Sequence, residues 1–170
     1  MRLFADDCIL YCTITTISDC VTLQEDIDKL FSWATAWQMQ FNSKKCHILA
    51  ITKQKSKPTT VYTLGTDTLS RVDSYPYLGV TISSDLRWHN NISCISIKAT
   101  RTLNFVRRNI YGCTPSAKAL AYTALVRPHL EYAASAWDPY LAMDISHLER
   151  VQRRAARFAC SDYPHTTSVT

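Results

Sequence analysis

The chain has 170 residues, which is long enough to bury a core and to form one or two small domains. Its 46% hydrophobic and 19% charged residues are typical of a globular protein and exclude a disordered one. No run approaches the roughly 18–20 apolar residues that span a bilayer, and the N-terminus has no signal-peptide pattern. The composition therefore predicts an intracellular protein, nuclear or cytoplasmic, with no membrane partner. The seven cysteines are an odd number without a C-x-x-C pair, which favours reduced thiols over zinc ligands or disulfides.

The net charge of +5 is distributed unevenly along the chain. Residues 1–97 carry nine Lys and Arg against nine Asp and Glu, whereas residues 98–170 carry ten against five. Such an asymmetry predicts that the second part binds a polyanion. The alternative is a basic helix face that is simply solvated.

The first dozen residues contain two short apolar arms, 3–5 and 8–11, on either side of Asp6 and Asp7. This pattern predicts a tight β-hairpin with both aspartates at its turn. Two carboxylates at the tip of a rigid hairpin offer oxygen ligands of the kind that Mg²⁺ prefers. The alternative is a solvated turn, because turns favour Asp for local hydrogen-bonding reasons.

An apolar stripe at helical spacing predicts a helix over about 20–40, with a capping box at Thr22 and Glu25. Apolar and β-branched runs then predict strands at 47–52, 59–64 and 68–72. A turn at 73–76 is expected to lead into a strand at 77–82, in which Gly79 indicates a close backbone approach.

From residue 89 the apolar period becomes helical. It predicts helices over about 90–110, from an N-cap at Thr114 to about 127, and over 145–160. Pro128 is expected to break or kink the second helix, and 130–137 to continue with helical character. Residues 161–170 carry little core signal and are expected to fray.

Several blocks resemble, in the same order, the reverse transcriptases of jockey-like non-LTR retrotransposons. They are FADD at 4–7, WQMQFNSKKC at 37–46, YLGV at 77–80, LVRPHLEYA at 125–133 and VQRRAARF at 151–158. The resemblance implies an α+β fold, in which a partial polymerase palm (aspartate hairpin, helix and antiparallel strands) is followed by an all-helical thumb. It places the palm at 1–88, the thumb at 89–165 and a frayed tail at 166–170.

The resemblance also implies site residues. Asp6 and Asp7 match two of the three metal-binding catalytic aspartates, and Lys45 matches a lysine proposed to help protonate pyrophosphate. The primer-grip hairpin matches Tyr77, Leu78, Gly79 and Val80, although Pro76 stands where the family often has a basic residue. The thumb cations expected to contact template–primer phosphates are Lys98, Arg101, Arg107, Arg108, Arg153, Arg154 and Arg157.

The family activity is RNA-directed DNA polymerisation with Mg²⁺, an RNA template and a DNA primer. The third metal-binding aspartate, the fingers and an endonuclease have no counterpart in these 170 residues. We therefore expect a fragment that binds Mg²⁺ weakly or not at all and is inactive alone. The alternatives are a non-catalytic nucleic-acid-binding module derived from the same element and an unrelated α+β domain.

Overall fold

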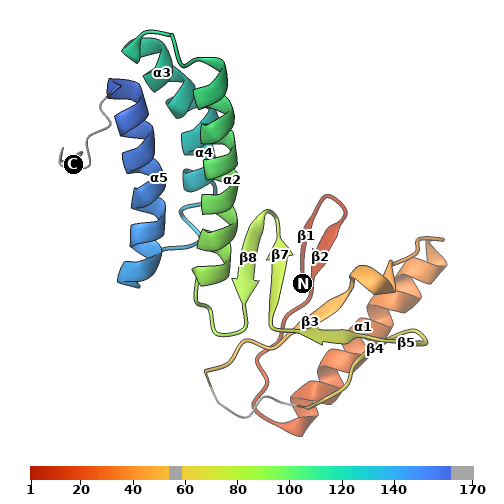
Figure 1. The fold of residues 1–170 in the computed structure, drawn as a ribbon. Helices are drawn as coiled ribbons and strands as arrows, with labels where there is room; N and C mark the ends of the chain where they lie inside the picture. The colour runs from red at the N-terminus through yellow and green to blue at the C-terminus, as the bar shows by residue number, and fades with distance from the viewer. Residues whose placement is uncertain (54–58, 162–170) are drawn as a thin grey trace. The chain divides into compact units, whose positions relative to one another are not determined.

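The computed structural model describes residues 1–53 and 59–161 and divides the chain into two compact units, Met1–Asp73 and Ser74–Thr170. Both helices and small two-stranded sheets are present, which is compatible with the α+β class (Figure 1). The palm and thumb boundaries at residues 88 and 89 stay a prediction. The tail predicted at 166–170 and most of the basic loop at 53–58 lie outside the described residues.

The first unit begins with the expected hairpin. Strands β1 (Arg2–Phe4) and β2 (Asp7–Ile9) pair antiparallel, with Phe4 opposite Asp7. The two-residue turn is therefore made by Ala5 and Asp6, and Asp7 already belongs to β2. Ala5 has φ +50°, and a positive φ at the first turn position matches the right-handed twist of the paired strands.

Helix α1 (Ile17–Ala36) follows, three residues earlier than predicted. Its capping box is formed by Thr16 and Asp19, so the prediction of a box at Thr22 and Glu25 was wrong. Backbone N–H groups of Thr15 and Thr16 donate to the Asp19 carboxylate and hold its pKa well below its usual range.

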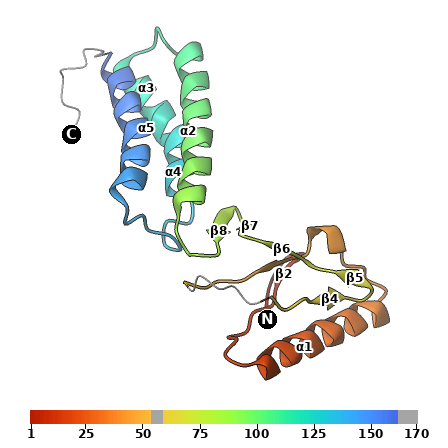
Figure 2. The same ribbon diagram turned by 60° about the horizontal axis from the view of Figure 1, so that its bottom comes forward.

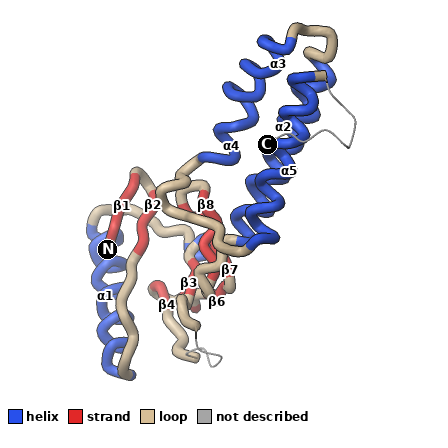
Figure 3. The backbone as a smooth tube through the Cα atoms, turned by 90° about the vertical axis from the view of Figure 1, so that its left-hand side faces the viewer, coloured by secondary structure: helices blue, strands red, loops and turns tan. Residues whose placement is uncertain are grey.

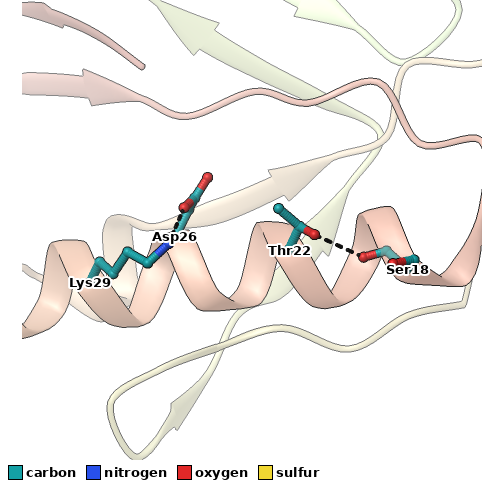
Figure 4. A network of polar contacts seen from close by, with 4 residues as sticks. All are labelled: Ser18, Thr22, Asp26 and Lys29. Carbon is teal, nitrogen blue, oxygen red and sulfur yellow. Dashed lines mark hydrogen bonds and ion pairs between the residues drawn. The ribbon is translucent and has the colours of Figure 1, made fainter.

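Thr22 instead lies inside α1. Figure 4 shows its hydroxyl donating to the Ser18 carbonyl at 3.1 Å and an ion pair between Lys29 and Asp26 at 3.0 Å. These contacts run along one helix and link no second element. The predicted apolar stripe is only partly buried, because Ala34 is buried but the Trp37 side chain is 69% exposed.

The other strands of the first unit are short. A 3₁₀ helix, η1 (Ser43–Lys45), leads into β3 (His47–Leu49), and β4 (Thr63–Leu64) pairs antiparallel with β5 (Asp67–Thr68). Gly65, in the turn between them, has φ +62° and lies against the Phe31 ring of α1. Gln24 of α1 exchanges two 3.0 Å hydrogen bonds with the backbone of Thr63, which fixes β4 on the helix.

Strand β6 (Ser70–Val72) pairs with β3 in parallel. We expected antiparallel strands here, and that expectation was wrong for this pair. The physical reason is the length of the connection, since about twenty residues, including the β4–β5 hairpin, let the chain return in the same direction.

The second unit opens with a hairpin of β7 (Ser74–Tyr77) and β8 (Val80–Ser83). The turn predicted at 73–76 and the continuous strand predicted at 77–82 were wrong. The turn is made by Leu78 and Gly79, whose φ values of +46° and +80° are those that a tight hairpin requires.

Three helical stretches complete this unit (Figures 1 and 2). They are α2 (His89–Asn109), the succession of α3 (Pro115–Ala121), η2 (Tyr122–Val126) and α4 (Arg127–Glu131), and α5 (Ala142–Cys160). Helices α2 and α5 lie side by side and run in the same direction, as the two views agree. The predicted N-cap is confirmed, because the Thr114 hydroxyl accepts a hydrogen bond from the Ala117 N–H.

The core of the second unit confirms the predicted helical stripes of α2 and α5. One cluster joins α2 to α4, η2 and α5, and a second joins α2 to β8 and Trp137. The buried members are Ala99, Leu103, Val106, Val126, Leu130, Val151, Ala155 and Phe158 in the first, and Val80, Ile92, Ile95 and Trp137 in the second. Both clusters found among the described residues lie in this unit.

Pro128 perturbs the second helical stretch, as predicted. It lacks an N–H to bond the carbonyl four residues earlier, and the preceding turn, η2, is π-helical. The stretch ends at Glu131, and residues 132–136 form turns (Figure 3), so the helical character expected for 130–137 was largely wrong. No described helix is long and apolar enough to cross a membrane.

Candidate nucleic-acid interface and aspartate hairpin

The aspartate hairpin presents its two carboxylates at an exposed tip. Asp6 is in the turn and Asp7 is the first residue of β2, so only one of the two occupies the turn position that we expected. Among the described residues, no group of three or more His, Cys, Asp or Glu could hold a metal ion. Two carboxylates supply only part of the octahedral oxygen shell that Mg²⁺ prefers, and magnesium binding at Asp6 and Asp7 stays a prediction.

Lys45 lies in the same unit as the hairpin. It is the last residue of η1, its side chain is exposed, and its backbone N–H donates to the Asn42 carbonyl at 2.9 Å. Strand β3 begins two residues after Lys45, so the residue lies just before the start of a strand. A role in phosphate chemistry stays a prediction for this residue.

The predicted primer-grip residues form the tip of the β7–β8 hairpin. Tyr77 ends β7, Leu78 and Gly79 make the turn, and Val80 begins β8 with a buried side chain. The turn is held from the helical part, because the Tyr132 hydroxyl donates to the Leu78 carbonyl at 3.0 Å.

Tyr132 is itself held in place. The Trp137 indole N–H donates to its carbonyl at 2.9 Å, and Trp137 packs with Val80 and Ile92. A Cβ added at Gly79 would lie 3.0 Å from Cε1 of Tyr132. The close approach expected at Gly79 is therefore made by an aromatic ring, and the hairpin tip is positioned by residues more than 50 positions away.

Gly79→Ala is expected to lower the free energy of unfolding of the second unit by about 1–3 kcal/mol. An alanine is strained at φ +80°, and its Cβ would press on the Tyr132 ring. Urea denaturation followed by far-UV circular dichroism measures the change. Gly112→Ala is the matched control, because no heavy atom lies within 4 Å of the new Cβ. Equal midpoints for the two variants would contradict this account of the turn.

A basic surface follows helices α2 and α5. Residues 86–130 contain no Asp or Glu, so α2 and α3 supply cations without carboxylates. The basic face is defined here as six arginines of the two neighbouring helices: Arg101, Arg107 and Arg108 on α2, and Arg150, Arg154 and Arg157 on α5. Arg101, Arg108 and Arg150 are exposed, while Arg107, Arg154 and Arg157 are half-buried. Lys98, also exposed, lies three residues before Arg101 on α2.

Two contacts across the α2–α5 pair hold this face together. The Arg154 guanidinium donates to Oδ1 of Asn104 at 3.1 Å, and the Arg107 guanidinium carbon lies 5.9 Å from the centre of the Phe158 ring. At the other end of the pair, Nδ1 of His89 lies 2.7 Å from the buried Asp144 carboxylate. These contacts place Arg107 of α2 and Arg154 of α5 along the seam between the two helices.

Not every predicted cation is equally available to a phosphate. Arg153 donates to Glu149 at 2.6 Å within α5, on the side opposite the α5 core stripe. Arg127 pairs likewise with Glu131 at 2.6 Å. Arg107, Arg108, Arg154 and Arg157 make no ion pair with any carboxylate of residues 1–53 and 59–161, which leaves their charge unneutralised by the described part of the chain.

Four further residues shape this region, and of these the sequence singled out Lys118 alone, as one of the basic groups of the helical part. Asn104 lies at i−3 from Arg107, so helical spacing was a usable signal for it, whereas Tyr111 lies in the turn after α2. Lys118 has a buried ammonium group, 5.1 Å from the centre of the Phe158 ring, and no local pattern marks it. Tyr132 reaches the β7–β8 turn only through the tertiary fold.

Comparison with known proteins gives a distant relative. No protein-family model matches the chain, and no solved structure matches it. The chain is similar to the RNA-directed DNA polymerase from mobile element jockey of Drosophila funebris, with 25% identity over 158 residues. The match covers 91% of this chain but only 17% of that protein. This similarity supports a reverse-transcriptase-like origin of the chain.

Proposed function

We propose that the chain is the palm-and-thumb portion of a mobile-element reverse transcriptase and that its helical unit binds the phosphate backbone of a template–primer. The match along nearly the whole chain supports the origin, and it extends across both units. The ordered blocks of the sequence support the finer assignment of palm and thumb.

The observation that carries the binding function is the basic face of α2 and α5. Its guanidinium groups lie on two neighbouring helices and lack carboxylate partners in the described residues. Such groups contact phosphate oxygens, which fix position on nucleic acid without reading sequence. Binding is therefore weak, indifferent to sequence and strongly salt-dependent.

The carboxylates of Asp6 and Asp7 act, in this proposal, as an incomplete part of a polymerase site. Two exposed ligands do not complete such a site, so the 170 residues alone do not extend a primer. They still bind nucleic acid through the basic face. Asp6-dependent DNA synthesis by the purified chain would contradict this part of the proposal. The incomplete set of carboxylates also favours the second candidate function, a non-catalytic nucleic-acid-binding module derived from the same kind of element.

A salt titration tests the binding function. A face making about four phosphate contacts gives a slope of log affinity against log salt near −3 to −4 for a duplex. The double variant Arg107→Gln/Arg108→Gln is expected to shallow this slope by about 2. Fluorescence anisotropy of a labelled RNA–DNA hybrid measures both slopes.

The matched control changes the net charge equally at cations that already have partners. Arg87 lies 3.7 Å from Asp85 and Arg127 lies 2.6 Å from Glu131. Arg87→Gln/Arg127→Gln is expected to leave the slope within about 0.5 of the starting protein. If both double variants shift the slope equally, net charge alone attracts the hybrid and the basic face is not the binding site.

A further inference from the structure

The basic face contains a shallow hollow at the C-terminal end of α2. Its volume is about 450 Å³, and it is lined by Asn104, Arg107, Arg108 and Tyr111. Asn104, Arg107 and Arg108 neighbour one another on α2 at i, i+3 and i+4, and Tyr111 lies in the turn just after the end of this helix.

The polar groups of the lining are nearly all hydrogen-bond donors. The two guanidinium groups have donors only. Oδ1 of Asn104 is already occupied by Arg154, which leaves the Asn104 amide N–H₂ as its remaining group. A lining of this kind fits an anion that accepts several hydrogen bonds, such as a phosphate group.

Tyr111 adds a flat apolar surface beside these donors. Its side chain is 68% exposed although the ring is large. The Lys118 ammonium lies 5.7 Å from the ring centre and donates to the Ser161 hydroxyl at 2.9 Å, so a buried cation stands beside the ring. An exposed aromatic ring next to arginines is the arrangement on which unpaired bases stack in single-stranded nucleic-acid sites.

We propose that this hollow binds one unpaired nucleotide of a single strand, with the base stacked on Tyr111 and the adjoining phosphate at Arg107 and Arg108. The inference deepens the proposed function, on which it rests. A base inside a duplex is already stacked and cannot lie on the ring, so the site distinguishes a single-stranded segment from the duplex that the rest of the basic face binds.

The test compares two labelled probes, a single-stranded oligothymidine and an RNA–DNA hybrid of equal length, by fluorescence anisotropy over a salt series. Tyr111→Ala is expected to weaken single-strand binding roughly 5- to 100-fold and to leave hybrid binding within about 2-fold. Its salt slope stays unchanged, because stacking releases no counterions. Tyr111→Phe and Tyr111→Trp are expected to retain single-strand binding.

Tyr140→Ala is the control for the loss of an exposed tyrosine, since Tyr140 is 66% exposed and does not line the hollow. Equal losses on both probes, or no loss of single-strand binding in Tyr111→Ala, would overturn the inference while the salt slopes still supported the basic face. If the unmodified chain shows no salt-dependent binding to either probe, the proposed function itself fails.

Discussion

Phe158→Ala is expected to lower the free energy of unfolding of the second unit by about 3–5 kcal/mol. Phe158 is 1% exposed and belongs to the cluster that joins α5 to α2 and α4. Truncation removes the apolar contacts of a whole ring and leaves a cavity between helices. It also removes the ring near which the Arg107 and Lys118 cations lie, at 5.9 and 5.1 Å.

Urea denaturation followed by far-UV circular dichroism measures this loss, because the helices of the second unit dominate the signal. Phe105→Ala is the matched control, since Phe105 lies on the same helix pair but is 57% exposed. The free energy of unfolding of this control is expected to change by no more than about 0.5 kcal/mol. Similar midpoints for the two variants would show that Phe158 does not hold the helices together.

Helix α2 could be predicted from the sequence because its apolar stripe is regular and fully buried. Ile92, Ile95, Ala99, Leu103 and Val106 recur at helical spacing, and all five are buried on one face of α2. Thr114 and Pro115 marked the next helix by local capping chemistry, which needs no tertiary information. Where the local signal and the packing agree, the prediction and the structure coincide.

The β7–β8 hairpin shows where local reasoning failed. The β-branched and aromatic run around Gly79 favoured a continuous strand, but the chain turns at Leu78 and Gly79. The turn is stabilised by Tyr132, and no sequence spacing relates these positions. The same holds for the parallel pairing of β3 with β6, which depends on the path of the whole intervening segment.

The positive charge of the candidate site could be predicted from the sequence, but the contacts between its two helices could not. The excess of cations after residue 97 is a property of composition, and the resemblance located several of them. The Arg153–Glu149 pair follows i,i+4 spacing and could have been foreseen. The Arg154–Asn104 contact and the hollow beside Tyr111 depend on the packing of α5 against α2, which a one-dimensional pattern does not contain.

The first unit is expected to lose stability at alkaline pH through Tyr62. Burial raises the pKa of this phenol to about 12, and a hydrogen bond with Cys20 acts in the same direction. Since the pKa is higher in the folded than in the unfolded chain, the stabilisation is complete below about pH 10 and is lost as the pH rises toward 12. The full loss corresponds to about 2–3 kcal/mol.

Tyr62→Phe isolates this contribution, because phenylalanine keeps the buried ring and cannot ionise. Protection of the first unit's amides against hydrogen exchange, compared between pH 8 and 11, is expected to fall more steeply in the unmodified chain than in Tyr62→Phe. Tyr11→Phe is the matched control, as Tyr11 is 59% exposed and its replacement is expected to leave the steep fall in place. Parallel pH profiles for the unmodified chain and Tyr62→Phe would mean that the Tyr62 phenol ionises as readily in the folded unit as in the unfolded chain, and the loss of stability would then have to come from other groups.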